Sequence, residues 1–365
     1  MKDEKIPVLV TAIGGGSYGG QILKAIRLAK GERYYIVGAD TNPNCPQFDL
    51  VDKRVLLPFA SDPSYLDKLL AVCTQHHIRA IFHGCDPELK LFALKREAIE
   101  HQSIFLPVNP WSVIQTCMNK EETSRRLREL GFDPPRFIRV TSKEELKKID
   151  WFPVVVKPSI GSGGSANAFI AQNTRELLGL ADYLGIETVA EHFLVQEYVG
   201  VPDDEYTVGV LHDMDGNYVN AIAVKRLLSG QLNIRMTVPN RTERHDLGPK
   251  LVISSGISHG YVGRFPEVTT PCKAIAKALG VKGPVNIQCR LIAGKVKVFE
   301  INPRFSGTTS IRAMVGYNEP DILLRRHVLH DRSIQPDFEY NEALILRNLI
   351  EIPVKKDEQY TMSDL

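Results

Sequence analysis

The sequence has almost no excess charge and no long apolar run. Its 45 lysines and arginines nearly balance its 43 aspartates and glutamates, so the net charge is only +2. Such a balance gives no electrostatic reason to expect nucleic acid or an anionic membrane as a partner. No apolar run approaches the roughly 20 residues that a membrane-spanning helix needs. We therefore expect no nucleic-acid partner and no membrane partner, and any bound phosphate must be held by local groups.

Cysteine pairs with metal or redox spacing are also missing. The six cysteines include no C-x-x-C pair, and the start "MKDEKIPVLV" lacks the long apolar core of a secretory signal. We therefore expect a reducing, cytoplasmic setting. At 365 residues and 43% hydrophobic content, the chain can form two or three domains that each bury a core.

The first hundred residues carry the pattern of a dinucleotide-binding fold. Short apolar runs alternate with helical patterns over residues 7–106, which predicts a parallel sheet with helices on both faces. The first turn, "VTAIGGGSYGG", contains G-x-G-x-x-G at Gly14, Gly16 and Gly19, and Asp40 ends the next apolar run, where an acid that binds a ribose is expected. Any tight strand-to-helix turn selects glycine for the same steric reasons. An NAD(P)-dependent oxidoreductase therefore stays open as one alternative.

The pattern changes past residue 107 to mixed helices and strands. Asn119 can cap a helix over residues 120–130 that Gly131 ends. From His192 onward long strand patterns dominate, with Asp215-Gly216 as a hairpin turn, so we predict a second, antiparallel sheet. This part has no Tyr-x-x-x-Lys or His/Asp pair in a second doubly wound half, which weighs against hydride chemistry.

The hairpin "VNIQCRLIAGKVKVFEINP" carries the best candidate metal ligands. Residues two apart on a strand face the same way, so Glu300 and Asn302 share one face. A two-residue turn would mix polar and apolar faces, whereas a three-residue loop over 293–295 keeps the polar residues together. We predict the three-residue loop, with pairs Gln288–Glu300, Asn286–Asn302, Ile287–Ile301 and Cys289–Phe299.

The oxygens of this polar face suit Mg²⁺, which prefers a few hard oxygen ligands together with substrate phosphates. Arg304, just after the strand, can reach an anion beside the metal. An amphipathic hairpin with a solvated outer face is the alternative. Elsewhere, Lys157 ends the strand pattern "VVVKP" before a Gly/Ser loop whose backbone N–H groups can close over phosphate.

These segments, in this order, resemble the ATP-grasp superfamily over nearly the whole chain. The sequence is most similar to the large-subunit synthetase unit of carbamoyl phosphate synthase and to related amino-acid ligases, including the pyrrolysine-pathway ligase. "VLVTAIGGGSYGGQILKAIRLA", "IVGADTNP" and "DPELKLFA" resemble the pre-ATP-grasp domain of that group, whose glycine loop usually faces the substrate. The resemblance implies an α/β and α+β protein with the ATP-grasp fold: a Rossmann-like pre-ATP-grasp domain over 1–112, a lid subdomain over 113–192, a large subdomain over 193–350 that encloses the nucleotide with the lid, and a polar tail over 351–365.

The resemblance also implies roles for individual residues. Those expected to bind the nucleotide are Lys120 and Lys157, the loop 161–165 with Gly163, Gly164 and Ser165, the adenine-reading linker Gln196, Glu197, Tyr198 and Val199, and the ribose-binding Glu205. The expected Mg²⁺ ligands are Gln288, Glu300 and Asn302, and the expected catalytic residues are Asn286, Arg304 and Lys157. The implied cofactors are ATP and two Mg²⁺ ions, with Mn²⁺ as a substitute. Many ATP-grasp ligases have Asp or Glu where this chain has Gln288, although the carbamoyl phosphate synthase group accepts Gln.

The activity that the resemblance implies is ATP-dependent carboxylate–amine ligation through an acyl phosphate. A subunit that phosphorylates bicarbonate or carbamate, and a nucleotide-binding protein without turnover, are further alternatives. We expect small-molecule carboxylate and amine substrates and leave a homodimer open. The segment 225–264 is either an exposed basic loop or the holder of an anionic substrate, through Arg235, Arg241, His245, His259 and Arg264.

Overall fold

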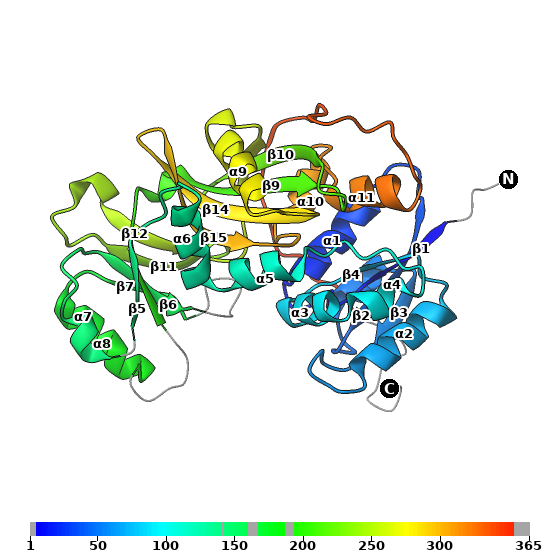
Figure 1. Cartoon of the computed structure of the whole chain (residues 1–365), viewed down its shortest axis with the longest axis horizontal. Coiled ribbons are helices and arrows are strands. Elements are labelled where there is room, and N and C mark those ends of the chain that lie inside the picture. The colour runs from blue at the N-terminus through cyan, green and yellow to red at the C-terminus, as the bar shows by residue number, and fades with distance from the viewer. Residues whose placement is uncertain (1–4, 141, 160–166, 187–192, 354–365) are drawn as a thin grey trace.

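The computed structural model describes residues 5–140, 142–159, 167–186 and 193–353. The parallel sheet and its helices, in blue and cyan, lie at one end of the molecule in Figure 1, and a small sheet with α7 and α8 lies at the other. A six-stranded sheet lies between them. Within the described ranges, no helix is long and apolar enough to cross a membrane.

The predicted parallel sheet is confirmed, with strand order β3-β2-β1-β4. Its strands are β1 (Ile6–Val10), β2 (Tyr34–Asp40), β3 (Lys53–Leu56) and β4 (Ala80–Phe82), and its helices are α1 (Tyr18–Arg27), α2 (Tyr65–Gln75), α3 (Asp86–Leu94) and α4 (Arg96–Glu100). Both faces of the sheet are covered. Val10 packs in one core with Ile22 of α1, while the adjacent Leu9 packs in another core with Leu69 of α2. This explains why the strands read as continuous apolar runs.

The predicted antiparallel sheet is also confirmed, with strand order β15-β14-β9-β10-β13-β16. Its strands are β9 (Glu205–His212), β10 (Tyr218–Arg226), β13 (Gly260–Gly263), β14 (Pro284–Ile292), β15 (Lys295–Asn302) and β16 (Ala343–Ile345). One face packs on α5 (Trp111–Met118), α6 (Lys120–Glu129) and α9 (Pro266–Ala278). The other face shares a core with α1, α10 (Thr309–Met314) and α11 (Glu319–His327). Helix α1 therefore lies between the two sheets, and its N-terminus brings the glycine loop beside the six-stranded sheet.

The remaining elements form two smaller sheets. One, ordered β5-β8-β6-β7, consists of β5 (Phe137–Val140), β8 (Phe193–Glu197), β6 (Val154–Pro158) and β7 (Phe169–Ala171), and packs on α7 (Lys143–Leu146) and α8 (Thr174–Leu184). The other pairs β11 (Ile234–Pro239) with β12 (Lys250–Ser254), and short 3₁₀ segments are η1 (Pro46–Leu50), η3 (Pro202–Asp204) and η4 (His245–Leu247). The predicted domain boundaries stay predictions.

Two local predictions from the sequence are confirmed at α6. The side chain of Asn119 accepts hydrogen bonds from the backbone N–H groups of Glu121 and Glu122, as a helix cap does. Gly131 has φ of 82°, a left-handed conformation that ends the helix at little cost only for glycine. The cap fixes where α6 begins, so it also fixes the position of Lys120 at the start of the first turn.

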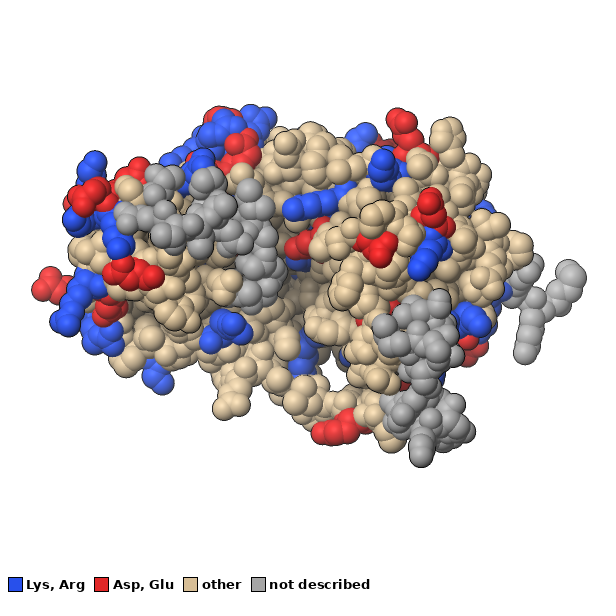
Figure 2. Space-filling model, turned by 90° about the horizontal axis from the view of Figure 1, so that it is seen from below, with Lys and Arg blue, Asp and Glu red and all other residues tan. Residues whose placement is uncertain are grey.

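On the face shown in Figure 2, lysine and arginine side chains are interspersed with aspartate and glutamate. This mixture agrees with the near balance of charge in the sequence.

Candidate active site

The hairpin of β14 and β15 brings the predicted metal ligands onto one face. Gln288 pairs with Glu300, Asn286 with Asn302 and Ile287 with Ile301, as predicted. The predicted loop is wrong, however, because Ile292 pairs with Lys295 across a two-residue turn. The predicted pair Cys289–Phe299 is also wrong, since Cys289 pairs with Val298. Phe299 is the additional residue of a β-bulge, which shifts the register by one position and so keeps the polar residues together.

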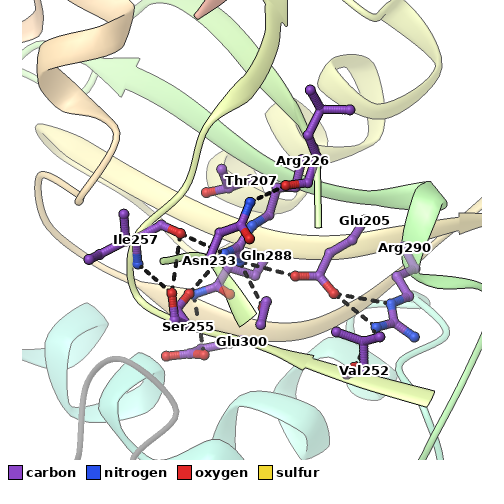
Figure 3. A network of polar contacts seen from close by, with 12 residues as sticks. Glu205, Thr207, Arg226, Asn233, Val252, Ser255, Ile257, Gln288, Arg290 and Glu300 are labelled. Atoms are coloured by element: carbon purple, nitrogen blue, oxygen red, sulfur yellow. Dashed lines mark hydrogen bonds and ion pairs between the residues drawn. The ribbon is translucent and has the colours of Figure 1, made fainter. Parts of the chain in front are cut away.

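Glu300 lies between two carboxamides. Gln288 Nε2 is 3.3 Å from Glu300 Oε2, and Asn302 Nδ2 is 3.3 Å from Glu300 Oε1. Figure 3 shows Gln288 and Glu300 from close by. A half-turn about the last side-chain bond of each amide presents its oxygen instead of its nitrogen. The cluster then offers one carboxylate and two carboxamide oxygens, which is a donor set that fits Mg²⁺.

Arg304 and Asn286 flank this cluster and are both largely buried. The Arg304 guanidinium donates to Asn302 Oδ1 at 3.2 Å, pairs with Asp86 at 3.1 Å and lies 4.3 Å from the centre of the Tyr18 ring. Asn286 Oδ1 accepts hydrogen bonds from Thr207 Oγ1 and from the Arg312 guanidinium, at 2.8 and 2.6 Å. Arg304 therefore supplies a positive charge beside the cluster, whereas the side-chain oxygen of Asn286 is already engaged by two donors.

A cavity, called here the polar cavity, opens over this cluster and encloses about 1150 Å³, part of it open solvent. Three Gly/Ser-rich loops line it, over residues 15–17, 255–258 and 306–308. The charged and amide residues in its wall are Asp86, Arg226, Asn286, Gln288, Glu300, Asn302 and Arg304. The glycine loop thus lies on the same cavity as the candidate metal ligands. Sequence reasoning did not find the loops 255–258 and 306–308, which carry no charged residue.

A second cavity, called here the apolar cavity, lies on the other side of Glu300, which lines both. Its walls include the apolar side chains of Val155, Ala168, Val252, Ile253 and Phe299. All the predicted nucleotide-binding residues that the structure describes line it, namely Lys120, Lys157, Gln196, Glu197, Tyr198, Val199 and Glu205. The predicted loop 161–165, with Gly163, Gly164 and Ser165, lies outside the described residues.

Lys157 is a buried residue in the wall of the apolar cavity. Its Nζ donates to Gln196 Oε1 at 2.8 Å and to the carbonyl oxygen of Phe299 at 3.2 Å. The bulge at Phe299 therefore also provides an acceptor for this lysine. Burial, and next the nearby charge of Lys120, lower the pKa of Lys157 to about 7, although Glu300 opposes the shift.

Glu205 lies at the start of β9 and is almost completely buried between two arginines. It pairs with Arg226 at 3.0 Å and with Arg290 at 2.9 Å, as Figure 3 shows. Burial alone would raise the pKa of Glu205, but the guanidiniums of Arg290 and Arg226 hold it below its ordinary value. Arg290 also lies 4.6 Å from the centre of the Tyr198 ring. The sequence did not suggest either arginine, although Arg290 is two residues beyond Gln288 on the same strand.

The glycine loop lacks the geometry of an open dinucleotide site. Asp40, the predicted ribose acid, accepts a hydrogen bond from the backbone N–H of Gly14 at 2.7 Å and thus closes onto the loop itself. Gly19 is required for packing, because a Cβ there would lie 2.5 Å from the carbonyl oxygens of Thr11 and Ala12. Gly16 has φ of 76°, which favours glycine whatever the ligand. Steric demands of the fold thus explain these glycines.

The residues expected to hold an anionic substrate lie elsewhere. Of Arg235, Arg241, His245, His259 and Arg264, all within the described part of the chain, none lines the polar cavity. Arg241 pairs with Glu176 at 2.8 Å, and His259 contacts Asn233. The segment contributes Arg226 and the loop 255–258 to the cavity instead.

Comparison with family models identifies two domains in the chain. Residues 253–344 match the model described as ATP-grasp in the biosynthetic pathway with Ter operon, and residues 9–106 match the PylC-like N-terminal domain. The chain contains an ATP-grasp domain. The predicted resemblance is confirmed, because residues 9–106 match a PylC-like N-terminal domain where a pre-ATP-grasp domain was expected.

Curated relatives include large chains of carbamoyl phosphate synthase. The chain is 24% identical over 315 residues to that of Thermoplasma acidophilum and 27% identical over 208 residues to that of Thermoanaerobacter pseudethanolicus. These matches cover 84% and 54% of this chain. The chain spans only 28% and 17% of the length of those relatives.

Solved structures share the fold. The biotin carboxylase domain of 2-oxoglutarate carboxylase from Hydrogenobacter thermophilus aligns with a TM-score of 0.63 at 17% identity, over 92% of this chain and 72% of that one. L-amino acid ligase from Bacillus licheniformis gives 0.60 at 17% identity, over 92% and 78%. D-alanine–D-alanine ligase from Bacillus anthracis gives 0.56 at 15% identity, over 90% and 98%. The predicted ATP-grasp fold is confirmed by these structures.

Proposed function

We propose that the protein is an ATP- and Mg²⁺-dependent ligase that joins a small carboxylic acid to an amine through an acyl phosphate. The observation that carries the proposal is that Glu300 lies between two cavities of different chemistry. One is narrow, largely apolar and entered by two lysines, which suits a nucleotide. The other is wide and polar, with arginine side chains in its wall, which suits an anionic acid.

The apolar cavity is proposed to bind ATP. The linker from Gln196 to Val199 would contact adenine, Glu205 would accept a hydrogen bond from the ribose, and Lys120 and Lys157 would hold the phosphates. Two of the structural neighbours, the Hydrogenobacter domain and the Bacillus anthracis ligase, are complexes with MgADP and with ATP respectively. The ion pairs of buried Glu205 with Arg226 and Arg290 support its proposed role at the ribose, because they hold its carboxylate charged and in a fixed direction.

The ligands proposed for Mg²⁺ are Gln288, Glu300 and Asn302, for two ions, with Mn²⁺ as a substitute. The metal would supply charge neutralisation at the phosphates. A substrate carboxylate oxygen forms a bond to the γ-phosphorus as the bond to the bridging oxygen of ADP breaks. Lys157 holds the transferring group from the nucleotide side and Arg304 from the acid side, while Asn286 lines the acid side. The amine then attacks the acyl carbon, loses its proton and expels phosphate.

A narrower reaction, phosphorylation of bicarbonate or carbamate, is the second candidate. The named relatives, which are carbamoyl phosphate synthase large chains, favour it. We also expect a homodimer, which is the state named for the Hydrogenobacter domain. Light scattering would test this expectation.

The test is ADP release from Mg-ATP in the presence of hydroxylamine, across amino acids, other carboxylates and bicarbonate. Hydroxylamine replaces the unidentified amine, so only the acid has to be found. ADP together with the matching hydroxamate supports the ligase and identifies the acid, whereas ADP with bicarbonate alone supports the second candidate. Glu300→Gln is the matched control, since it removes the charge and keeps the shape. ADP release that persists in this variant would contradict the proposed metal site.

A further inference from the structure

Arg226, the last residue of β10, joins the walls of the two cavities. Only 3% of the residue is exposed. One terminal nitrogen of its guanidinium, Nη1, donates to Glu205 Oε1 at 3.0 Å and to Ser254 Oγ at 2.8 Å. The other, Nη2, donates to the carbonyl oxygens of Ser255 and Ile257 at 2.8 and 3.2 Å. Figure 3 shows Arg226 together with its partners Glu205, Ser255 and Ile257.

The two terminal nitrogens of Arg226 contact the walls of different cavities. Glu205 and Ser254 line the apolar cavity, whereas Ser255 and Ile257 line the polar one. Hydrogen bonds of Ser255 also hold the start of the loop 255–258. The Ser255 N–H donates to the Asn233 carbonyl at 2.9 Å, Ser255 Oγ donates to the Leu232 carbonyl at 2.7 Å, and the Ile257 N–H donates to Ser255 Oγ at 3.1 Å. The guanidinium therefore holds the loop to the nucleotide side.

The shape of the guanidinium makes this connection rigid. Its donors lie in one plane at fixed angles, so a shift of Nη1 with Glu205 also shifts Nη2 and the carbonyls that it holds. A lysine in its place would keep the charge but would bring a single nitrogen, which cannot bind both walls in this way. Glu205 is itself fixed from its other side by Arg290.

We propose that Arg226 is a positioning residue that couples nucleotide binding in the apolar cavity to the order of the loop 255–258 in the polar cavity. The inference rests on the proposed function, because it requires that a nucleotide engages Glu205. A hydrogen bond from the nucleotide to the Glu205 carboxylate adds a further restraint to this ion-paired group, the Arg226 guanidinium transmits the restraint to the loop, and the wall that receives the acid becomes less mobile. The acid then meets a preformed wall after the nucleotide has bound.

The experiment is hydrogen exchange of the peptide over residues 250–260, with and without the non-hydrolysable analogue Mg–AMP-PNP. The coupling predicts that the analogue slows exchange of the Ser255 and Ile257 amides at least about fivefold, the lower end of measured couplings. Arg226→Lys is expected to bind the analogue, judged by a raised melting temperature, and to lose this slowing. The matched control is Arg325→Lys, which changes an arginine of α11 that pairs with Asp331 beyond the helix. The control is expected to keep the slowing.

The outcomes separate the coupling from the proposed function. If the analogue binds the unaltered protein without slowing exchange, or slows it equally in Arg226→Lys, the coupling is refuted. Loss of analogue binding by Arg226→Lys also overturns it, because Arg226 would then belong to the nucleotide site alone. If Arg226→Lys does not fold, Ser254→Ala is measured instead: weakened slowing supports the coupling and unchanged slowing refutes it. Failure of the unaltered protein to bind the analogue refutes the proposed function, and the coupling with it.

Discussion

The lowered pKa of Lys157 predicts that the protein takes up a proton when a nucleotide binds near neutral pH. Burial and the neighbouring Lys120 lower its pKa to about 7 in the free protein. At pH 8 the free amine thus carries roughly a tenth of a proton, and at pH 6 about nine-tenths. A bound triphosphate favours the charged form and returns the pKa toward its ordinary value of about 10.4. The expected uptake is therefore about 0.9 proton at pH 8, about 0.5 at pH 7 and about 0.1 at pH 6.

The assay is calorimetric titration with Mg–AMP-PNP in buffers of different ionisation enthalpy. The slope of the observed enthalpy against the buffer enthalpy gives the number of protons taken up. Lys157→Met removes the titrating group, so subtracting its slope removes the contribution of the ligand's own phosphates. Lys225→Met is the matched control, because Lys225 lies over the Tyr206 ring and lines neither cavity. An uptake that does not change between pH 6 and 8, or that persists in Lys157→Met, would refute the reasoning.

Three further tests, two of which use a second substitution for comparison, address the site and the packing that supports it. Glu300→Gln should lower ADP release at least about 100-fold with an unchanged circular dichroism spectrum, because the metal loses its charged ligand; a smaller loss in steady-state assays contradicts the assignment. Gly19→Ala should destabilise the fold by about 1–3 kcal/mol in urea unfolding, since its Cβ meets two backbone oxygens, while Gly131→Ala, which has open space, should cost only about 1 kcal/mol. Equal losses would contradict this account. Arg312→Met should destabilise by about 3–5 kcal/mol because it leaves the buried Glu319 unpaired, and adding Glu319→Met should recover most of that loss; no recovery in the double variant would show that the pair is not the cause.

Much of the fold could be predicted from the sequence, because its longer elements carry a clear period. The parallel sheet and the capped helix α6 follow from apolar runs, helical spacing and the signals at Asn119 and Gly131. Shorter elements could not be found in this way. Helix α10 has six residues, nearly all of them buried, and so shows no polar face. Strand β16 has three residues and is defined only by its pairing with β13.

The register of the hairpin shows how a correct result can rest on an incorrect turn. The polar pairs of Glu300 and Asn302 follow from the need to keep one face apolar. The two-residue turn could not be predicted from this need, because it requires Ala293 in a left-handed conformation, with φ of 47°, which alanine rarely adopts. The bulge at Phe299 then compensates for the shorter turn. Both deviations depend on the finished sheet and leave no signal in the hairpin sequence.

The candidate site also contains residues that the sequence predicts and residues that it does not. Part of the apolar cavity's lining, from Lys120 and Lys157 to Glu205, was predicted from a resemblance in motif order, which fixes positions without knowledge of contacts. Arg226 and Arg290 were not, because their shared partner Glu205 is 21 and 85 residues away in the chain. Isolated arginines on strands give no indication of a common carboxylate. Such long-range ion pairs emerge only when β9, β10 and β14 lie side by side.

The glycine loop shows why a motif has to be interpreted through its surroundings. In a dinucleotide site the loop leaves its N–H groups, and the acid after the second strand leaves its carboxylate, for the ligand. Here the Asp40 carboxylate accepts the Gly14 N–H, so each satisfies the other. Gly15 and Gly16 of the same loop line the polar cavity, whose wall also includes Asn302. The same steric requirements that produce G-x-G-x-x-G therefore bring the parallel sheet, in this chain, against the wall of the polar cavity.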